Sequence, residues 1–270
     1  VEADAAVTAN VDITTDVGAL LIDADDDNNA GTGTGLLTVA GGVTLTSAAG
    51  ITLDATEGGI TFTGVGTLNA VNGVTINDAV TATAGTLTID ADTDNDGTGT
   101  FTTIAAGTID STGQTLDITA GDVVIGGAVT AATLINITDS DGGGIGLGDT
   151  TVGGFQLSGT ELQRLTATTL ELITAGNVTV DSISATNSNN VTNLTIDAVG
   201  AITFASAAST FNALTVEADD GVTANVDITT DVGALAIDAD AENATTGLLT
   251  VAAGVTLTSA AGITLDATEG

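Results

Sequence analysis

The sequence predicts an all-β fold, a right-handed parallel β-helix (β-solenoid) in which the chain winds through coils of about 20–24 residues. Three observations support this prediction. Apolar and polar residues alternate in many short segments, a long stretch of the sequence occurs twice, and the composition suits a narrow core of stacked aliphatic side chains. We expect one continuous solenoid over residues 1–270.

The alternation is the most local of these observations. Segments such as VDITT from Val11, VTLTS from Val43 and TLTID from Thr86 alternate Val, Ile or Leu with Thr or Asp. A period of two residues is typical of a strand with one buried face. Gly, Asn and Asp separate the segments, as in turns. Strand-ending Ile residues that precede acidic loops recur at roughly whole multiples of about 20–24 residues, which gives the expected coil length.

The second observation is a long internal repeat. Residues 1–58 return almost letter for letter as residues 216–270, so the long repeat covers residues 1–215 and its second copy begins at 216. The offset falls from 215 to 212 residues by Gly247, the counterpart of Gly35. The first copy therefore holds three more residues in its Asp/Asn stretch, which we expect to be a surface loop because loops tolerate length changes. We also expect the same pattern to continue beyond the 270 residues.

The composition favours a narrow aliphatic core and limits the partners. The chain is 43% hydrophobic, has five Phe and no Trp, Tyr, His, Cys, Met or Pro, and carries 35 acidic residues against Arg164 alone, for a net charge of −34. Proline is rare in internal strands because each strand must donate its N–H groups. With a single basic residue against 35 acidic ones we expect no nucleic-acid partner. No apolar run reaches the ~18 residues of a membrane helix, so we expect no membrane insertion.

The residue inventory also argues against catalysis. Without His, Cys, Lys or Tyr the usual bases and nucleophiles are missing, and only carboxylate pairs remain. We therefore expect a non-enzymatic structural component of an extracellular or cell-surface filament (fibre, sheath or stalk), whose main partner is itself. Three alternatives stay open: an adhesin stalk that binds surfaces or carbohydrate, an ice-binding array of Thr pairs such as Thr44/Thr46 and Thr61/Thr63, and a β-helical glycosidase.

Acidic loops supply the only candidate sites, and calcium or another divalent cation is the only candidate cofactor. Asp92, Asp94 and Asp96, followed by Gly97, match the first half of a calcium-binding loop, with carboxylates at alternate positions and Gly at the sharp turn. The last ligand position falls on Thr103, where a Glu is needed. A second candidate comprises Asp25 and Asp27. Both loops are interpreted either as weak divalent-cation sites or as solvated acidic turns.

Two further segments carry a resemblance to a known class of proteins. The segment that starts at Gly41, GGVTLTSAAGITLDATEGGITF, resembles the strand-and-turn sequences of giant bacterial surface proteins of the filamentous-haemagglutinin and autotransporter-passenger type. LSGTELQRLTATTLELITAGNVTV from Leu157 is similar to a segment of long β-strand-repeat proteins of that class, and within it Ser158 and Glu161 fit the capping box of a short helix. The resemblance implies a secreted β-helical stalk used in adhesion or extracellular matrix.

Overall fold

The computed structural model describes residues 1–27, 35–131, 133–150, 154–242 and 247–267. It is 51% strand and 3% helix, and within each of its parts the sheets are parallel, which confirms the all-β prediction. The chain divides into two compact units, Val1–Ile135 and Asn136–Gly270, with β17 (Leu134–Asp139) spanning the division. A single solenoid over the whole chain stays a prediction, and each unit is taken by itself here.

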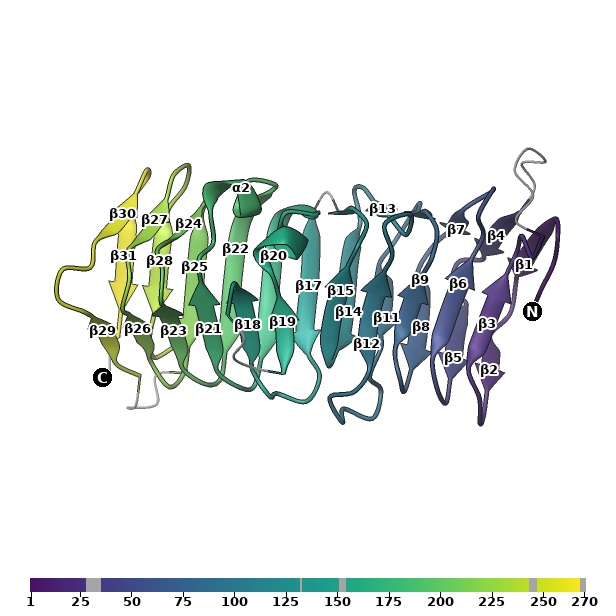
Figure 1. Cartoon of the computed structure of the whole chain (residues 1–270), viewed down its shortest axis with the longest axis horizontal. Helices are drawn as coiled ribbons and strands as arrows, with labels where there is room; N and C mark the ends of the chain where they lie inside the picture. The colour runs from purple at the N-terminus through teal and green to yellow at the C-terminus, as the bar shows by residue number, and fades with distance from the viewer. Residues whose placement is uncertain (28–34, 132, 151–153, 243–246, 268–270) are drawn as a thin grey trace. The chain divides into compact units, whose positions relative to one another are not determined.

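In unit 1 the chain passes through three parallel sheets in turn, leaving one strand in each, and then begins the next coil (Figure 1). The first sheet comprises β1 (Ala6–Ala9), β4 (Leu36–Val39), β7 (Ile60–Phe62), β10 (Val80–Ala82), β13 (Ile109–Ser111) and β16 (Val129–Ala131). The second comprises β2 (Ile13–Thr15), β5 (Thr44–Ser47), β8 (Gly66–Ala70), β11 (Leu87–Asp90) and β14 (Thr115–Ala120). The third comprises β3 (Leu20–Asp23), β6 (Ile51–Asp54), β9 (Val74–Ile76), β12 (Thr100–Thr103) and β15 (Asp122–Ile125).

Unit 2 has the same three-sided organisation, with two short helices at its corners (Figure 1). One sheet comprises β19 (Phe155–Leu157), β18 (Ile145–Gly148), β21 (Val178–Asp181), β23 (Ile202–Ala205), β26 (Val222–Ala224) and β29 (Leu249–Val251). The second comprises β20 (Leu165–Thr174), β22 (Val191–Ala198), β25 (Leu214–Ala218), β28 (Leu235–Asp238) and β31 (Ile263–Asp266). The third comprises β24 (Ser209–Phe211), β27 (Ile228–Thr230) and β30 (Leu257–Ser259), and the helices are α1 (Gly159–Leu162) and α2 (Ala185–Ser188).

Coil length is less uniform than the sequence predicted. In unit 1 the paired residues Leu37 and Ile60 are 23 positions apart (60 − 37), and Ile60 and Val80 are 20 apart (80 − 60). Val80 and Ile109 are 29 apart (109 − 80), because this coil also holds the acidic loop after β11. The predicted 20–24 residues is therefore right for the plain coils and wrong for coils that carry an extra loop. The extra residues leave the sheets at the corners, so the strands keep their register.

In the core of each unit, the inward-facing aliphatic and aromatic side chains of successive strands stack in rows. In the first sheet of unit 1, Leu37, Ile60, Val80 and Ile109 stack in one row, each at most 2% exposed. All five Phe side chains lie in the core, at most 1% exposed. Gly66 makes room for one of them, because a Cβ at that position would lie 2.3 Å from the ring of Phe62. Close stacking of small and aliphatic side chains explains how the chain builds a core with so few aromatic residues.

The long repeat of the sequence is also a repeat of structure. The pairing of Val7 with Leu37 in the first copy recurs as the pairing of Val222 with Leu249 in the second, and the two other sheets match in the same way. Corner hydrogen bonds recur as well. Thr15 donates to the carbonyl oxygen of Gly18 at 2.6 Å, and its counterpart Thr230 donates to that of Gly233 at 2.8 Å. The loop in which the copies differ in length falls on residues outside the described ranges.

The capping box predicted from the sequence is present at α1. The backbone N–H of Ser158 donates to the carboxylate of Glu161 at 2.9 Å, and the hydroxyl of Ser158 accepts from the N–H of Glu161 at 3.3 Å. Helix α2 has the same box, formed by Ser184 and Asn187, which the sequence analysis did not identify. The side-chain amide of Asn187 donates to the carbonyl oxygen of Gly159 at 2.9 Å, so the two helices are joined corner to corner.

Candidate cation sites at the acidic corners

Three corners share the sequence Ile-Asp-Ala-Asp, at residues 22–25, 89–92 and 237–240, and are called acidic corners below. In each, the side chain of the first Asp accepts a hydrogen bond from the backbone N–H of the second, at 3.0 to 3.2 Å. The second Asp (Asp25, Asp92 or Asp240) is at most 1% exposed. Each corner therefore places one carboxylate beneath the loop that follows it.

Each loop returns to its corner at a glycine. A Cβ on Gly99 would lie 1.9 Å from the carbonyl oxygen of Ala91, and a Cβ on Gly247 would lie 1.7 Å from that of Ala239. At Gly35 the added Cβ would lie 2.3 Å from the Cβ of Asp25. Only a residue without a side chain allows the returning backbone to cover the buried Asp so closely. The corner thus fixes where the loop starts and ends.

The second acidic corner brings together the three carboxylates that the sequence singled out. Oxygen atoms of Asp92, Asp94 and Asp96 lie within 4.8 Å of one another, with Asp92 buried and the other two exposed. The loop turns through Asn95 and Gly97, which have positive φ of 54° and 80°. Carboxylate oxygens in this arrangement are the ligands that calcium prefers, so the cluster could hold a metal ion, as predicted.

Hydrogen bonds and charge set the electrostatics of this cluster. The N–H of Gly97 donates to Oδ2 of Asp92 at 2.9 Å, and Oδ1 of Asp96 accepts from the hydroxyl and the N–H of Thr98 at 2.6 and 2.9 Å. The bonds from Thr98 lower the pKa of Asp96. Partial desolvation within the loop raises the pKa of Asp94, and the carboxylates of Asp96 and Asp92 act in the same direction. Because three carboxylates lie close together in a unit without Lys or Arg, the cluster favours a cation.

The second half of a calcium-binding loop does not form. Thr103 lies in β12, 1% exposed, and its hydroxyl accepts hydrogen bonds from the N–H groups of Gly126 and Gly127, both at 3.1 Å. It belongs to the core of the next corner and does not reach the cluster. Any bound ion would complete its shell with water or backbone oxygen atoms.

The other acidic groups are arranged differently. Within the described residues no further set of three carboxylates shows the spacing found at Asp92, Asp94 and Asp96, so Asp25 and Asp27 form no such compact group. In unit 2, Oδ2 of Asp139 accepts from the N–H of Gly144 at 2.8 Å and from the hydroxyl of Thr174 at 2.7 Å. Burial raises the pKa of Asp139. This carboxylate therefore anchors the Gly-rich turn that follows it.

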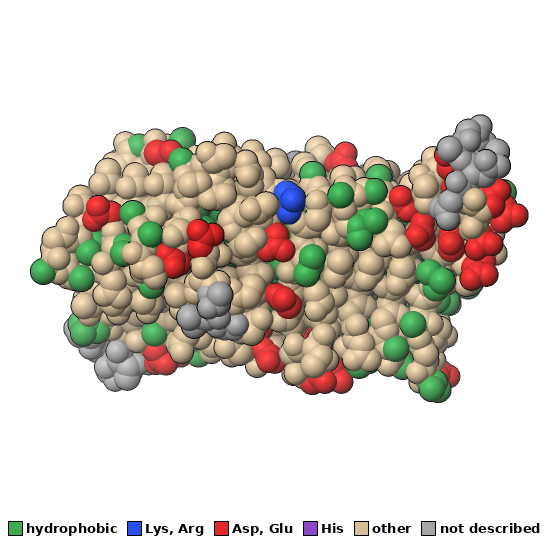
Figure 2. Space-filling model, viewed as in Figure 1, with side chains coloured by type: hydrophobic (Ala, Val, Ile, Leu, Met, Phe, Trp, Pro, Cys, Tyr) green, Lys and Arg blue, Asp and Glu red, His purple; other side chains and the backbone are tan. Residues whose placement is uncertain are grey.

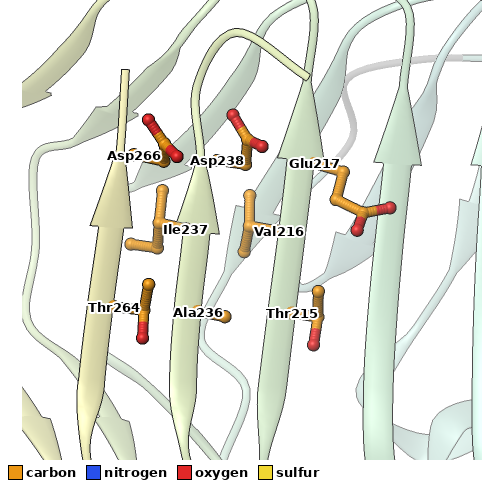
Figure 3. A pocket seen from close by; sticks show the side chains of 8 residues that line it. All are labelled: Thr215, Val216, Glu217, Ala236, Ile237, Asp238, Thr264 and Asp266. Carbon is orange, nitrogen blue, oxygen red and sulfur yellow. The ribbon is translucent and has the colours of Figure 1, made fainter. Parts of the chain in front are cut away.

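Columns of carboxylates on the outer faces of the sheets were missed by the sequence analysis. In unit 2, Asp197, Glu217, Asp238 and Asp266 occupy one register position on four successive strands. Figure 3 shows the last three in a row beside a surface hollow of about 210 Å³, which Thr215, Ala236 and Thr264 also line. Burial raises the pKa of Glu217, and Asp197, Glu171 and Asp238 contribute in the same direction. Like charges in adjacent strands destabilise a sheet, so this column carries a cost in free energy.

The first copy of the repeat has the same column. Glu2 pairs with Asp23 and Asp23 with Asp54, at the positions that correspond to Glu217, Asp238 and Asp266. This column of carboxylates ends at Asn77, whose Nδ2 donates a hydrogen bond to Oδ2 of Asp54 at 2.9 Å. Figure 2 shows acidic side chains gathered over the first coils of unit 1. The sequence signal was the Asp or Glu that follows the last buried residue of a strand, but only the register shows which of these residues meet.

The Thr pairs considered for ice binding form no continuous double array. Thr38, Thr61 and Thr81 share one column in the first sheet of unit 1, but the next residue in that column is Asp110. In the second sheet, Thr46 is paired with Asn69. In these two sheets of unit 1 the columns of hydroxyl groups are therefore interrupted by other side chains.

Comparisons with known proteins identify no relatives of this chain. No protein-family model, no curated protein and no solved structure matches it. The resemblance to filamentous-haemagglutinin and autotransporter-passenger proteins therefore remains at the level of parallel β architecture. Among the residues that the structure describes, none of the helices has the length and apolar character needed to cross a membrane.

Proposed function

We propose that the chain is a structural, non-enzymatic segment of an extracellular or cell-surface filament, whose shaft is a right-handed parallel β-helix. The observation that carries the proposal is the recurrence of one register and one set of corner hydrogen bonds in both copies of the long repeat. Coils that present the same rows to their neighbours can be added without limit, as in other solenoids. Right-handed winding is proposed because parallel strand crossovers almost always have that hand.

The absence of typical catalytic residue types supports a structural role over an enzymatic one. The chain contains no His, Cys, Lys or Tyr, and the acidic groups lie in corners and columns that recur along the chain. Repetition of this kind suits a role in which every coil contributes equally. The main partner is then a further length of the same protein, and the high negative charge keeps neighbouring shafts apart.

Electron microscopy and fibre diffraction of the purified protein test this proposal together. We expect thin unbranched fibres with a repeat of ~4.8 Å along the axis, the spacing of parallel strands. Antibody labelling of intact source cells should place the fibres outside the membrane. Separate compact particles at every protein and calcium concentration, or labelling only after the cells are broken, would contradict the proposal.

We also propose that Asp92, Asp94 and Asp96 bind calcium or another divalent cation. The spacing of their oxygens, within 4.8 Å, and the lack of any Lys or Arg in unit 1 support this. Asp94→Asn keeps the shape of the exposed side chain and removes one ligand charge. Isothermal titration with calcium should show one site fewer in this variant, while Asp117→Asn, on the outer face of β14, should leave the number unchanged. Equal binding by both variants would make the loop a solvated turn.

A further inference from the structure

The coil formed by β29, β30 and β31 is paired on one side only. These strands lie against β26, β27 and β28, and within the described residues no strand pairs with their other edge (Figure 1). The inward side chains of this coil are correspondingly open, with Val251 41% exposed, Ile263 44% and Leu265 48%. Unpaired strand edges beside exposed apolar side chains form a surface that accepts further strands.

Nearly the same coil occurs elsewhere in the chain, where it is covered. Residues 36–58 and 248–270 differ at one position only. In the first copy, β4, β5 and β6 are paired on their second edge with β7, β8 and β9. Leu53, the counterpart of Leu265, then has no exposed surface. Because the two coils share their sequence, the first coil shows which kind of segment fits the second.

The segment that covers the first copy is residues 59–77. Phe62 lies opposite Val39 and continues its row of the core, and the backbone N–H of Thr63 donates to the carbonyl oxygen of Val39 at 3.0 Å. In the other two sheets, β8 and β9 are paired in the same parallel way with β5 and β6. The segment therefore both buries the apolar side chains of the coil and pairs with its strands.

The covering segment also avoids a contact between like charges. Residues 59–77 contain no acidic residue. At the end of this segment, Nδ2 of Asn77 donates to Oδ2 of Asp54, which is the counterpart of Asp266 at the open edge. The first coil of a second copy of the chain carries acidic residues at positions 2, 4, 12, 16 and 23 instead. Like charges on adjacent strands destabilise a sheet, so the open edge favours a coil with the charge pattern of residues 59–77.

The single difference between the two coils adds a steric requirement. The position of Gly41 is taken by Ala253 in the second copy. A Cβ on Gly41 would lie 3.1 Å from the Cα of Gly64, so a coil that docks against Ala253 has to shift by a few tenths of an ångström. A Cβ on Gly64 would lie 2.8 Å from the Cα of Gly41 even without this methyl group. The docking coil therefore needs Gly at the position of Gly64.

We propose that the open edge of β29, β30 and β31 is a docking surface for a coil with the sequence pattern of residues 59–77, supplied by a further length of the same protein. The pattern comprises inward aliphatic and Phe side chains, Gly at the corner, and Asn at the end of the third strand. The inference rests on the proposed function, in which such a length is the main partner, and it adds which coil this length presents.

Binding of a synthetic peptide tests the proposal. A fluorescein-labelled peptide of residues 59–77 should bind the 270-residue chain, one peptide per chain, in anisotropy titrations that extend to millimolar chain. In hydrogen-exchange mass spectrometry the peptide should slow exchange in β29, β30 and β31 and leave β1 and β2 unchanged. Absence of binding, or slowing at β1 and β2 alone, would overturn the docking surface. Electron microscopy of the fibres uses no peptide, so the proposed function and this inference can fail separately.

Two peptide variants with the same chemical change separate docking from non-specific adsorption. Asn77→Asp places a carboxylate opposite Asp266 and removes a charge-assisted hydrogen bond, so it should weaken binding by about tenfold or more. Asn69→Asp is the matched control and should bind as the unmodified peptide does, because its position faces Thr258, the counterpart of Thr46. In the chain, Asp266→Asn should restore binding of the Asn77→Asp peptide.

Equal binding of the two peptide variants would refute the predicted register at this edge. Sedimentation velocity of the chain without peptide examines the other occupant. Dimers in which β29, β30 and β31 are protected from exchange would show that a second copy docks there through its own first coil, and the proposal would be wrong. We expect the chain to leave these strands unprotected until the peptide is added.

Discussion

Leu53 and Leu265 are the same residue of the long repeat in two different environments, and replacing each by Ala tests the packing argument. Leu53 lies in β6 between Ile22 and Ile76 of the adjacent strands and has no exposed surface. In the 270-residue chain, Leu265 occupies the same position in β31, the last strand, where it is paired with Ile237 on one side only and is 48% exposed. Sequence context and strand propensity are matched, so the two variants differ mainly in burial.

The two substitutions should lower the free energy of unfolding by clearly different amounts. Truncating a fully buried Leu destabilises proteins by about 2–5 kcal/mol, because a cavity adds to the lost transfer free energy. For the half-exposed Leu265 no closed cavity forms, and about half of the transfer free energy remains, roughly 1 kcal/mol. Leu53→Ala should therefore lower the local stability by at least about 1–2 kcal/mol more than Leu265→Ala.

Hydrogen exchange measured by mass spectrometry at graded urea concentrations gives the opening free energy of each strand. In Leu53→Ala the loss should concentrate in β3, β6 and β9, because each coil of a solenoid contacts only its neighbours. Far-ultraviolet circular dichroism checks that both variants keep their strand content. Equal losses in the two variants, or a loss spread evenly over unit 1, would refute the packing of Leu53 between two coils.

Two further predictions concern charge and backbone space. Glu217→Gln removes the middle charge of the carboxylate column and should stabilise unit 2 by about 0.5 kcal/mol in thermal unfolding at neutral pH, a small value because the side chain is half-buried. Since the pKa of Glu217 is raised, its stabilising contribution is present below its unfolded-state pKa and is lost as the pH rises through the folded-state pKa. The unmodified chain should therefore gain stability as the pH falls from neutral toward the ordinary pKa of Glu, about 4.3, and Glu217→Gln should gain less; an equal gain would contradict the assignment. Gly99→Ala should cost about 1–3 kcal/mol in urea unfolding because of the clash with Ala91, whereas Gly18→Ala, with nothing within 4 Å, should be near neutral. Similar effects of the two glycine substitutions would argue against closure of the loop at Gly99.

The fold was predictable because its main signal is local. Alternation in segments such as Leu87–Asp90 gives the buried and outward positions directly, and the structure confirms that Leu87 and Ile89 are each 1% exposed. The Gly and acidic residues between the strand segments indicated the positions of the corners. The capping box at Ser158 was visible because a Ser is followed three residues later by Glu. The box at Ser184 was missed because its partner is Asn187, a less common residue at that position.

The candidate site was predictable only within a single loop. Asp92, Asp94 and Asp96 are close in sequence, so their proximity in space follows from the turn. Groups from different coils, such as Glu217 with Asp238, meet only through the register between strands. That register could not be derived from a fixed coil length, because some coils carry extra residues and Val80 is paired with Ile109, 29 positions later (109 − 80).

Each acidic loop ends at a glycine that lies against its corner. The length of the loop can therefore change while the rest of the fold stays the same. Between Asp92 and Gly99 there are six residues (99 − 92 − 1), and between Asp25 and Gly35 there are nine (35 − 25 − 1), yet each loop ends at a glycine that lies against its own acidic corner. Insertions and deletions at these corners change the number of carboxylates per coil without disturbing the aliphatic rows. The surface charge density of the shaft can therefore evolve, or be engineered by grafting a peptide into a loop, independently of the core that holds the coils together.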